Sequence, residues 1–375
     1  MTPAAFRAHF PSLSTTAHLC SCSEGALSDR VMVAMSEFMT SWRIHAAPWQ
    51  AWMEEVDRAR ALFAALIHAE PRQVAVVSCA SEGAFQVAWS LAYDRRPRIL
   101  TNDLEFPSIA HVWLAQGARG ARVEFVPHRE GLIDPAGYLE RLGPDVGLVS
   151  VPLVAYANGL CMPVADIAEH AHRHGARVFV DAYQGAGVLP VDVEALQCDY
   201  LVAGTLKYLL GAPGLAFLYV RGAEPDAHPP VLTGWFARKN PFAFNPRLLD
   251  YADDARRFQT GTPSIPAAFA GRAGLELVSL TEPAEVFRHV AALADRLQDR
   301  LLEAGFRLLS PLDPRRRGPQ VAVYVDDPEA AAAYLAARGV VVSPRGRVVR
   351  LSLHYYNNQD DVDRVIEGLK AYREH

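Results

Sequence analysis

The chain has 375 residues, of which 50% are hydrophobic and 21% charged, with a formal net charge of −5 at pH 7. At about 150 residues per domain, this length predicts two or three lobes. The composition is typical of a globular protein and argues against large-scale disorder. The charge gives no general attraction to nucleic acid, no apolar stretch reaches the ~18 residues of a spanning helix, and the N-terminus lacks a signal pattern. We therefore expect a cytoplasmic protein that binds neither nucleic acid nor membrane.

The cysteine and histidine patterns indicate neither disulfides nor a metal site. The five cysteines are an odd number spread along the chain, and Cys20 and Cys22 have no second pair at zinc spacing. His170, His172 and His174 end a predicted helix, where cationic side chains interact favourably with the helix dipole. We therefore expect no metal.

The first ~70 residues place three tryptophans ahead of a helical pattern, which predicts an arm and a helix that pack against another part of the molecule. From residue 74 onward, short β-branched runs alternate with helical patterns at 82–91, 109–116 and 164–174. This alternation predicts a mostly parallel sheet with both faces covered. The runs span residues 74–77, 98–100, 123–126, 146–151, 178–180, 200–202 and 215–220. The last two could instead meet as a tight antiparallel edge.

After Pro266 the pattern changes to long helical stretches, short strands near 321–324 and 348–351, and a closing helix at 360–373. We therefore expect an α/β protein in three parts. Residues 1–70 form an N-terminal arm and helix, residues 71–265 a large domain, and residues 266–375 a small C-terminal α+β domain that could include part of the arm.

The most informative residues are an aspartate and a lysine. Asp181 ends a β-branched run, and Lys207 follows it by 26 positions, just beyond the next run. Open parallel sheets bind ligands at the carboxyl ends of their strands. An anion and an amine that converge there match pyridoxal phosphate (PLP), whose ring nitrogen needs an anion and whose aldehyde needs an amine. Taken alone, the pair is better explained as an ordinary strand-end Asp and a solvated Lys.

Further motifs favour the cofactor interpretation of this pair over the ordinary one. They are, in chain order, 78–83 (SCASEG), 105–108 (EFPS), 154–159 (VAYANG), 181–184 (DAYQ), 257–263 (RFQTGTP) and 350–357 (RLSLHYYN). From about residue 20 to 370, their order resembles the class V aminotransferase family of fold-type I PLP enzymes, which includes cysteine desulfurases, isopenicillin N epimerase-like proteins and kynureninases. The resemblance implies a large, mostly parallel-sheet domain, a smaller C-terminal α+β domain and PLP as cofactor.

The resemblance also implies cofactor contacts in the large domain. Ala80 and Ser81 would hold the phosphate at the start of a helix, whose free N–H groups and dipole favour an anion. Phe106 would lie over the PLP ring, and Tyr156 and Gln184 near its phenolic oxygen. Each motif has a plain structural alternative, such as an N-cap serine or a core phenylalanine.

The remaining implied contacts complete the site. Lys207 would hold PLP as an imine, with Asp181 at the pyridine nitrogen and Thr205 also in contact with the cofactor. Gly261 and Thr262 would reach the phosphate bound by the neighbouring subunit, which implies a homodimer with shared active sites.

Arg350 is implied in binding the substrate carboxylate, because a planar guanidinium matches a carboxylate with two parallel hydrogen bonds. Strand alternation places Arg350 and Ser352 on one face of their strand. The alternative interpretation is an exposed strand arginine.

Two departures from the family pattern and one further resemblance bear on the reaction. Leu206 stands where an imidazole or aromatic ring commonly precedes the lysine, so one phosphate or ring contact is missing or supplied elsewhere. Residues 340–349 contain no cysteine, which argues against a persulfide-forming desulfurase. Residues 234–236 (GWF) resemble a kynureninase stretch and place Trp235 near the phosphate.

The function that these observations favour is a class V aminotransferase-like enzyme of specialised amino-acid metabolism. The alternative is a PLP-dependent lyase, either a C–S β-lyase or a kynureninase-like C–C hydrolase. A further alternative is a non-catalytic PLP-fold protein that senses a ligand or serves as a scaffold. The sequence does not separate the reactions, because all of them begin with the same electron withdrawal by the cofactor ring.

Overall fold

A computed structural model describes residues 1–222 and 228–375, and its centre is a seven-stranded sheet in the order β2-β10-β9-β8-β7-β3-β4. The strands are β2 (Val74–Val77), β3 (Arg98–Asn102), β4 (Arg122–Val126), β7 (Val146–Pro152), β8 (Arg177–Asp181), β9 (Tyr200–Gly204) and β10 (Ala216–Val220). Neighbouring strands from β9 to β4 pair in parallel, whereas β10 is antiparallel to both β9 and β2. The predicted antiparallel pairing of the last two runs is confirmed. Its predicted place at the edge is wrong, because β2 pairs with the outer side of β10.

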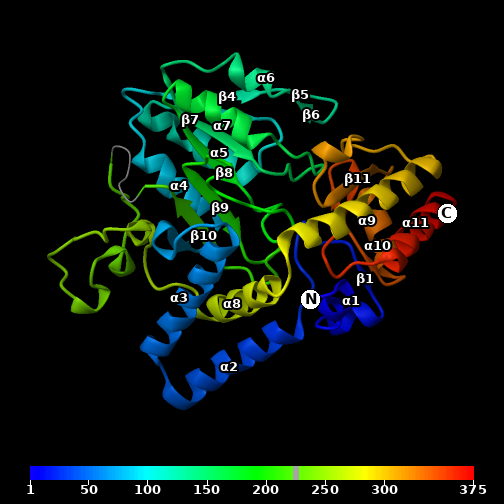
Figure 1. Ribbon diagram of the computed structural model, residues 1–375, viewed down its shortest axis with the longest axis horizontal. Coiled ribbons are helices and arrows are strands. Elements are labelled where there is room, and N and C mark those ends of the chain that lie inside the picture. Colours follow the sequence, from blue (N-terminus) through cyan, green and yellow to red (C-terminus); the bar gives the residue numbers. More distant parts are fainter. Residues whose placement is uncertain (223–227) are drawn as a thin grey trace.

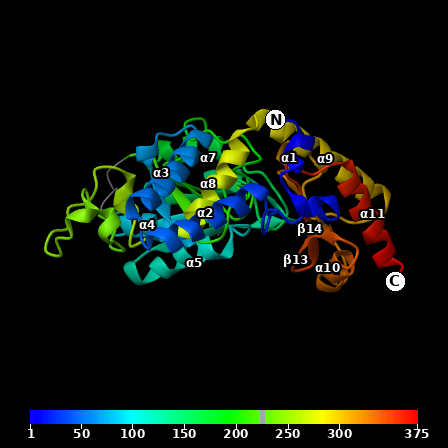
Figure 2. The same cartoon turned by 90° about the horizontal axis from the view of Figure 1, so that it is seen from below.

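Helices cover both faces of the sheet (Figures 1 and 2). The core on one face includes α3 (Trp49–Leu66), α7 (Val164–Arg173) and α8 (Ile265–Ser279), with α2 (Asp29–His45) packed on α8, and the core on the other face includes α4 (Ala80–Ser90) and α5 (Pro107–Ala115). Strand alternation explains the division, since Val178 and Val180 of β8 belong to the first core and Phe179 to the second. A short helix, α6 (Ala136–Leu139), and a small hairpin of β5 (His128–Arg129) and β6 (Leu132–Ile133) lie beyond β4.

The C-terminal elements form a second, smaller core. Its three-stranded antiparallel sheet has the order β11-β14-β13, with strands Gln320–Tyr324, Val348–Ser352 and Ser343–Arg345, and packs with α9 (Pro283–Glu303), α10 (Pro328–Ala336) and α11 (Gln359–Arg373). The start of the chain joins this core: β1 (Ala17–His18) pairs in parallel with β12 (Val340–Val341), and Phe6 of α1 (Pro3–Arg7) is buried there. Figure 1 shows both termini beside these elements. The three-part division at residues 70 and 265 stays a prediction.

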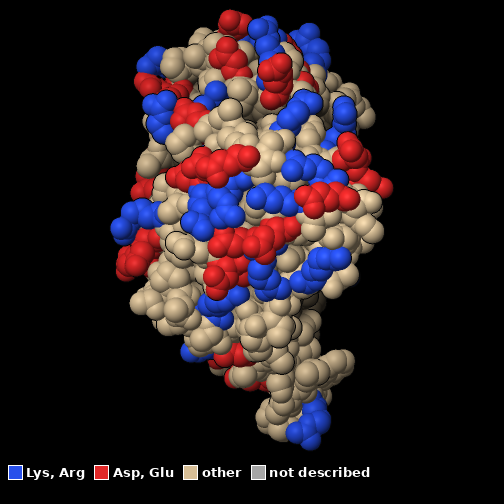
Figure 3. Space-filling view, turned by 90° about the vertical axis from the view of Figure 1, so that its right-hand side faces the viewer, with Lys and Arg blue, Asp and Glu red and all other residues tan. Residues whose placement is uncertain are grey.

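The surface of the C-terminal lobe carries intermixed charges of both signs (Figure 3). None of the helices in the described ranges is long and apolar enough to cross a membrane.

The turn that carries Lys207 is held by close backbone packing. Gly25 donates its N–H to the Leu206 carbonyl at 2.8 Å, and a Cβ on Gly25 would lie only 2.4 Å from the Lys207 carbonyl oxygen. From the other side, a Cβ on Gly274 of α8 would lie 2.3 Å from the Leu209 carbonyl oxygen. These two approaches require glycine, because any side chain would force the elements apart.

We predict that Gly274→Ala lowers the free energy of unfolding by about 1–3 kcal/mol, because the added methyl group must displace the backbone after Lys207. Gly117→Ala is the matched control, since no atom lies within 4 Å of its added Cβ. Urea titration with intrinsic fluorescence measures both variants. Equal stability of the two would contradict the packing described for α8.

Candidate active site

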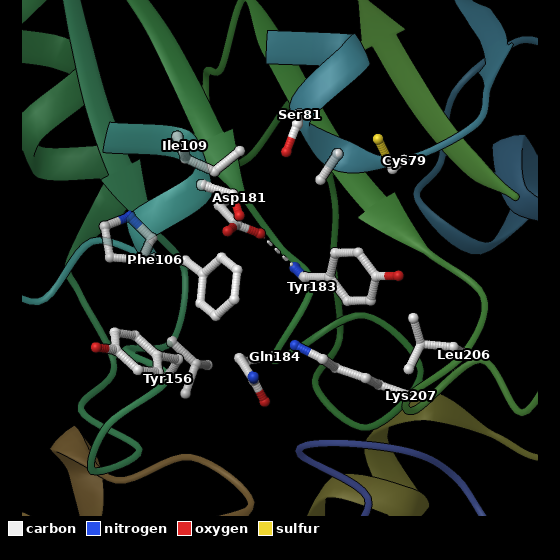
Figure 4. Close-up of a pocket in the computed structure, with 14 residues that line it drawn as sticks. Cys79, Ser81, Phe106, Ile109, Tyr156, Asp181, Tyr183, Gln184, Leu206 and Lys207 are labelled. Atoms are coloured by element: carbon white, nitrogen blue, oxygen red, sulfur yellow. Dashed lines mark hydrogen bonds between the residues drawn. The ribbon is translucent and has the colours of Figure 1, made fainter. Parts of the chain in front are cut away.

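A cavity opens at the edge of the sheet where β2, β3, β7, β8 and β9 end. It brings together residues that are far apart in the sequence and that the motifs predicted to meet (Figure 4). The predicted residues that line it are Ala80, Ser81, Phe106, Tyr156, Asp181, Gln184 and Lys207. Such a position is where open parallel sheets bind ligands.

The Lys207 amine lies between two aromatic rings. Its Nζ is 4.4 Å from the ring centroid of Tyr183 and 5.3 Å from that of Phe106. Burial lowers the pKa of Lys207 to about 8, although the nearby Asp181 carboxylate opposes the shift. The amine is therefore partly neutral at physiological pH, as a nucleophile or proton acceptor must be.

Two buried carboxyl groups lie near one another at this edge. Asp181 accepts a hydrogen bond from the Tyr183 N–H at 2.9 Å, and Glu105 accepts one from the Ser150 hydroxyl at 2.8 Å and one from the Phe106 N–H at 2.9 Å. Burial raises the pKa of both groups, and the Asp181 charge also contributes to raising the pKa of Glu105 to about 8. A positive charge bound here would be stabilised, which fits a protonated pyridine ring.

The first turn of α4 supplies free backbone donors. Its N-cap residue, Cys79, makes no side-chain capping bond, and Ala80 and Ser81 face the cavity. The Glu82 carboxylate of the same turn points elsewhere, accepting hydrogen bonds from the Ser78 N–H at 2.7 Å and the Thr260 hydroxyl at 3.0 Å. The free N–H groups and the helix dipole suit a phosphate group.

Gln184 and Tyr156 form the wall near Phe106. Gln184 Nε2 donates to the Cys22 carbonyl at 3.0 Å, while its Oε1 is buried and has no partner within the described ranges. The Tyr156 ring meets the Phe106 ring edge-on, with centroids 5.2 Å apart. An unsatisfied polar atom beside a cavity fits a bound polar ligand.

Four other predicted cofactor contacts lie outside this cavity. The Thr205 hydroxyl donates to the Ala212 carbonyl at 2.7 Å and so closes the turn after β9. Trp235 packs in a cluster of aromatic rings. Gly261 and Thr262 line a separate cavity on the other side of the start of α4. Any contact of these last two residues with a phosphate in the Lys207 cavity of their own chain would need a rearrangement.

Arg350 is 2% exposed, so its alternative interpretation as an exposed strand arginine is wrong. It lies on the central strand of the small sheet, outside the residues that line the cavity. Its Nη1 donates to the Tyr156 carbonyl at 2.9 Å, and its Nη2 donates to the Ser23 hydroxyl at 2.9 Å and the Ser343 hydroxyl at 2.5 Å. Its Nε is buried without a partner in the described structure. Arg350 is thus connected to the cavity through Tyr156 and keeps one unused donor.

Sequence reasoning assigned no role to two residues at this edge of the sheet. Glu105, the first residue of the EFPS motif, is buried near Asp181 but is not among the residues that line the cavity. Tyr183 lies inside the DAYQ motif between its two assigned positions, and it lines the cavity beside Lys207. In each case the signal was a polar residue adjacent in sequence to an assigned one.

The comparisons with known proteins agree with this geometry. A family model described as aminotransferase class-V matches residues 25–365. The uncharacterized aminotransferase YcbU of Bacillus subtilis is 35% identical over 369 residues, which cover 98% of each chain. The chain belongs to the class-V aminotransferase family. The family assignment made from the motifs is therefore confirmed, together with the enzyme class and PLP as cofactor.

One further relative and one solved structure extend the comparison. A kynureninase of Deinococcus radiodurans is 29% identical and covers 97% of this chain and 92% of its own. The apo structure of a cysteine desulfurase from Thermococcus onnurineus NA1 superposes with a TM-score of 0.89 at 23% identity, covering 100% of this chain and 98% of that one. The predicted fold class is confirmed.

We predict that Lys207 in the cofactor-free protein reacts with an amine-specific reagent at a rate that rises with pH around a midpoint of about 8. Only the neutral amine reacts, so the rate falls as the pH drops below this midpoint. Asp181→Asn should lower the midpoint further, because the carboxylate favours the charged amine. The chain has only three lysines, so peptide mass spectrometry resolves the label. A midpoint near 10.5 would contradict the burial of the amine.

Proposed function

We propose that this protein is a PLP-dependent enzyme of amino-acid metabolism in which Lys207 bonds covalently to the cofactor aldehyde. In this arrangement Asp181 lies beside the pyridine nitrogen, and the first turn of α4 holds the phosphate. The observation that carries the proposal is the convergence of Lys207, Asp181 and the start of α4 in one cavity. PLP, when bound there, supplies an electron sink for negative charge at the substrate Cα.

The residues of the cavity would have separate roles in the reaction. The Lys207 amine, with a pKa of about 8, can accept a proton from the substrate Cα and return it. The Asp181 carboxylate would keep the ring nitrogen protonated when the cofactor is bound. Phe106 and Tyr183 shield the amine from water on two sides.

We assign transamination as the reaction, supported by the 35% identity to a protein named as an aminotransferase. The alternative is a lyase reaction, such as C–S β-elimination or kynureninase-like C–C hydrolysis, supported by the kynureninase relative. A cytoplasmic location remains an expectation from the sequence.

A survey of substrates and products distinguishes among these reactions. The purified protein is incubated with a panel of amino acids, with and without a keto acid, and assayed for new amino acid, pyruvate, ammonia and thiol. We expect new amino acid only when the keto acid is present. Pyruvate, ammonia and thiol formed together without a keto acid would support C–S β-elimination, and alanine formed without a keto acid would support C–C hydrolysis. Turnover of no amino acid, with cofactor bound at Lys207, would contradict the assignment of amino acids as substrates.

We also propose that the protein is a homodimer in which Gly261 and Thr262 serve the partner's site. Helix α2 exposes several large apolar side chains, including Trp42 at 60%, and Phe244 is 69% exposed. Figure 3 shows few charges at the end of the molecule where α2 and α3 meet. Clustered exposed apolar side chains mark association surfaces.

For Arg350 we propose the substrate carboxylate as ligand, reached when the carboxylate displaces the Ser23 or Ser343 hydroxyl from the guanidinium. We predict that Arg350→Lys weakens amino-acid binding by about 2 kcal/mol, since one point charge replaces two directed bonds. The absorbance of the cofactor without substrate should not change.

The measurement is the absorbance change of the bound cofactor as an amino acid is added. Amines and amides that lack a free carboxylate serve as controls and should bind both proteins equally. Equal midpoints for the amino acid itself in wild type and Arg350→Lys would return Arg350 to a structural role.

A further inference from the structure

Tyr183 is a cavity residue to which the motifs assign no role. It extends from the end of β8 into the cavity, between the start of α4 and the Lys207 turn (Figure 4). Its ring centroid lies 4.4 Å from Lys207 Nζ. The backbone N–H of Tyr183 donates a hydrogen bond to Asp181. Its hydroxyl group, in contrast, has no hydrogen-bond partner within the described residues. The phenol hydroxyl is therefore an unused donor, and it points toward the side of the cavity where Cys79 and Leu206 lie (Figure 4).

Gly204, the last residue of β9, makes room for this phenol. A Cβ at Gly204 would lie 2.0 Å from Tyr183 Oη and 2.2 Å from Tyr183 Cζ. The backbone of Gly204 is not in the left-handed region, so its conformation would allow other residues. The position requires glycine because the Tyr183 hydroxyl occupies the space of the missing side chain.

The residue before Lys207 indicates which contact the Tyr183 hydroxyl could replace. Leu206 lines the cavity directly before Lys207 and offers no polar side-chain atom. Burial is the main cause that raises the pKa of Tyr183, and the charges of Asp181 and Cys79 act in the same direction, so the phenol stays protonated and remains a donor. Cys79 is the N-cap of α4, which places the phenol near the helix end that suits a phosphate.

We propose that the Tyr183 hydroxyl donates a hydrogen bond to the phosphate group of PLP and so supplies the polar contact that Leu206 lacks. Gly204 is the position that makes this contact possible. The inference rests on the proposed function, because it requires PLP at Lys207. It assigns to Tyr183 a part in cofactor binding, next to the free N–H groups of the first turn of α4.

Tyr183→Phe removes the hydroxyl and keeps the ring. The dissociation constants of the cofactor-free protein are measured for PLP and for pyridoxal, which has the same aldehyde but no phosphate. We expect Tyr183→Phe to weaken PLP binding about tenfold, as for a hydrogen bond to a charged group, and to leave pyridoxal binding unchanged. Equal weakening of both ligands, or no change in either, would overturn the proposal.

Tyr156→Phe is the matched control, since it removes another phenol hydroxyl from the same cavity. It should leave the ratio of the two dissociation constants unchanged. Gly204→Ala tests the geometry independently: its methyl group must displace the phenol, so it should weaken PLP binding selectively in the wild type but not in a Tyr183→Ala background. An equal loss in both backgrounds would refute the role of Gly204.

The outcomes separate this inference from the proposed function. If the wild type binds PLP at Lys207 and Tyr183→Phe binds it equally well, only the role of Tyr183 fails. If the wild type does not bind PLP at Lys207, the proposed function fails as well.

Discussion

The structure depends on the burial of charged groups of opposite sign at one edge of the large sheet. An isolated charge in a low-dielectric site is costly, and side chains there shift their pKa values toward the neutral form. The Lys207 amine and the Asp181 and Glu105 carboxyl groups all shift in that direction. A ligand with an aldehyde and a protonatable ring nitrogen would reduce this energetic cost, because the aldehyde binds the amine and the ring nitrogen pairs with the carboxylate. The charges that line the cavity therefore match those of its cofactor.

The scaffold brings these groups together from separate parts of the chain. Asp181 is fixed as the last residue of a buried strand, whereas Lys207 lies on a turn with little regular structure of its own. That turn is held by the N-terminal segment at Gly25 and by α8 at Gly274. The segments that precede and follow the large sheet thus both determine where the lysine amine lies. Buried Arg350 connects the small lobe to the same cavity through Tyr156.

Much of this arrangement could be predicted from the sequence, and the failures have physical causes. Local β-branched runs and helical periodicity are strong signals, so the strand ending at Asp181 and the lysine beyond the next run were found. The place of β10 inside the sheet depends on a pairing with β2 that is distant in sequence and leaves no local signal. The burial of Arg350 depends on hydrogen bonds to residues distant in sequence, and Thr205 is turned to a carbonyl of its own turn. The place of the Tyr183 hydroxyl depends on the space above Gly204, a contact between two strand ends that no motif records.

The central claim, that Lys207 carries the cofactor, is tested most directly by reducing the protein with borohydride in the presence of PLP and mapping the modified peptide by mass spectrometry. The account predicts a single stable adduct on Lys207, and none on Lys239 or Lys370, with loss of the adduct in Lys207→Ala. An adduct on Lys239 that persists in Lys207→Ala would contradict it.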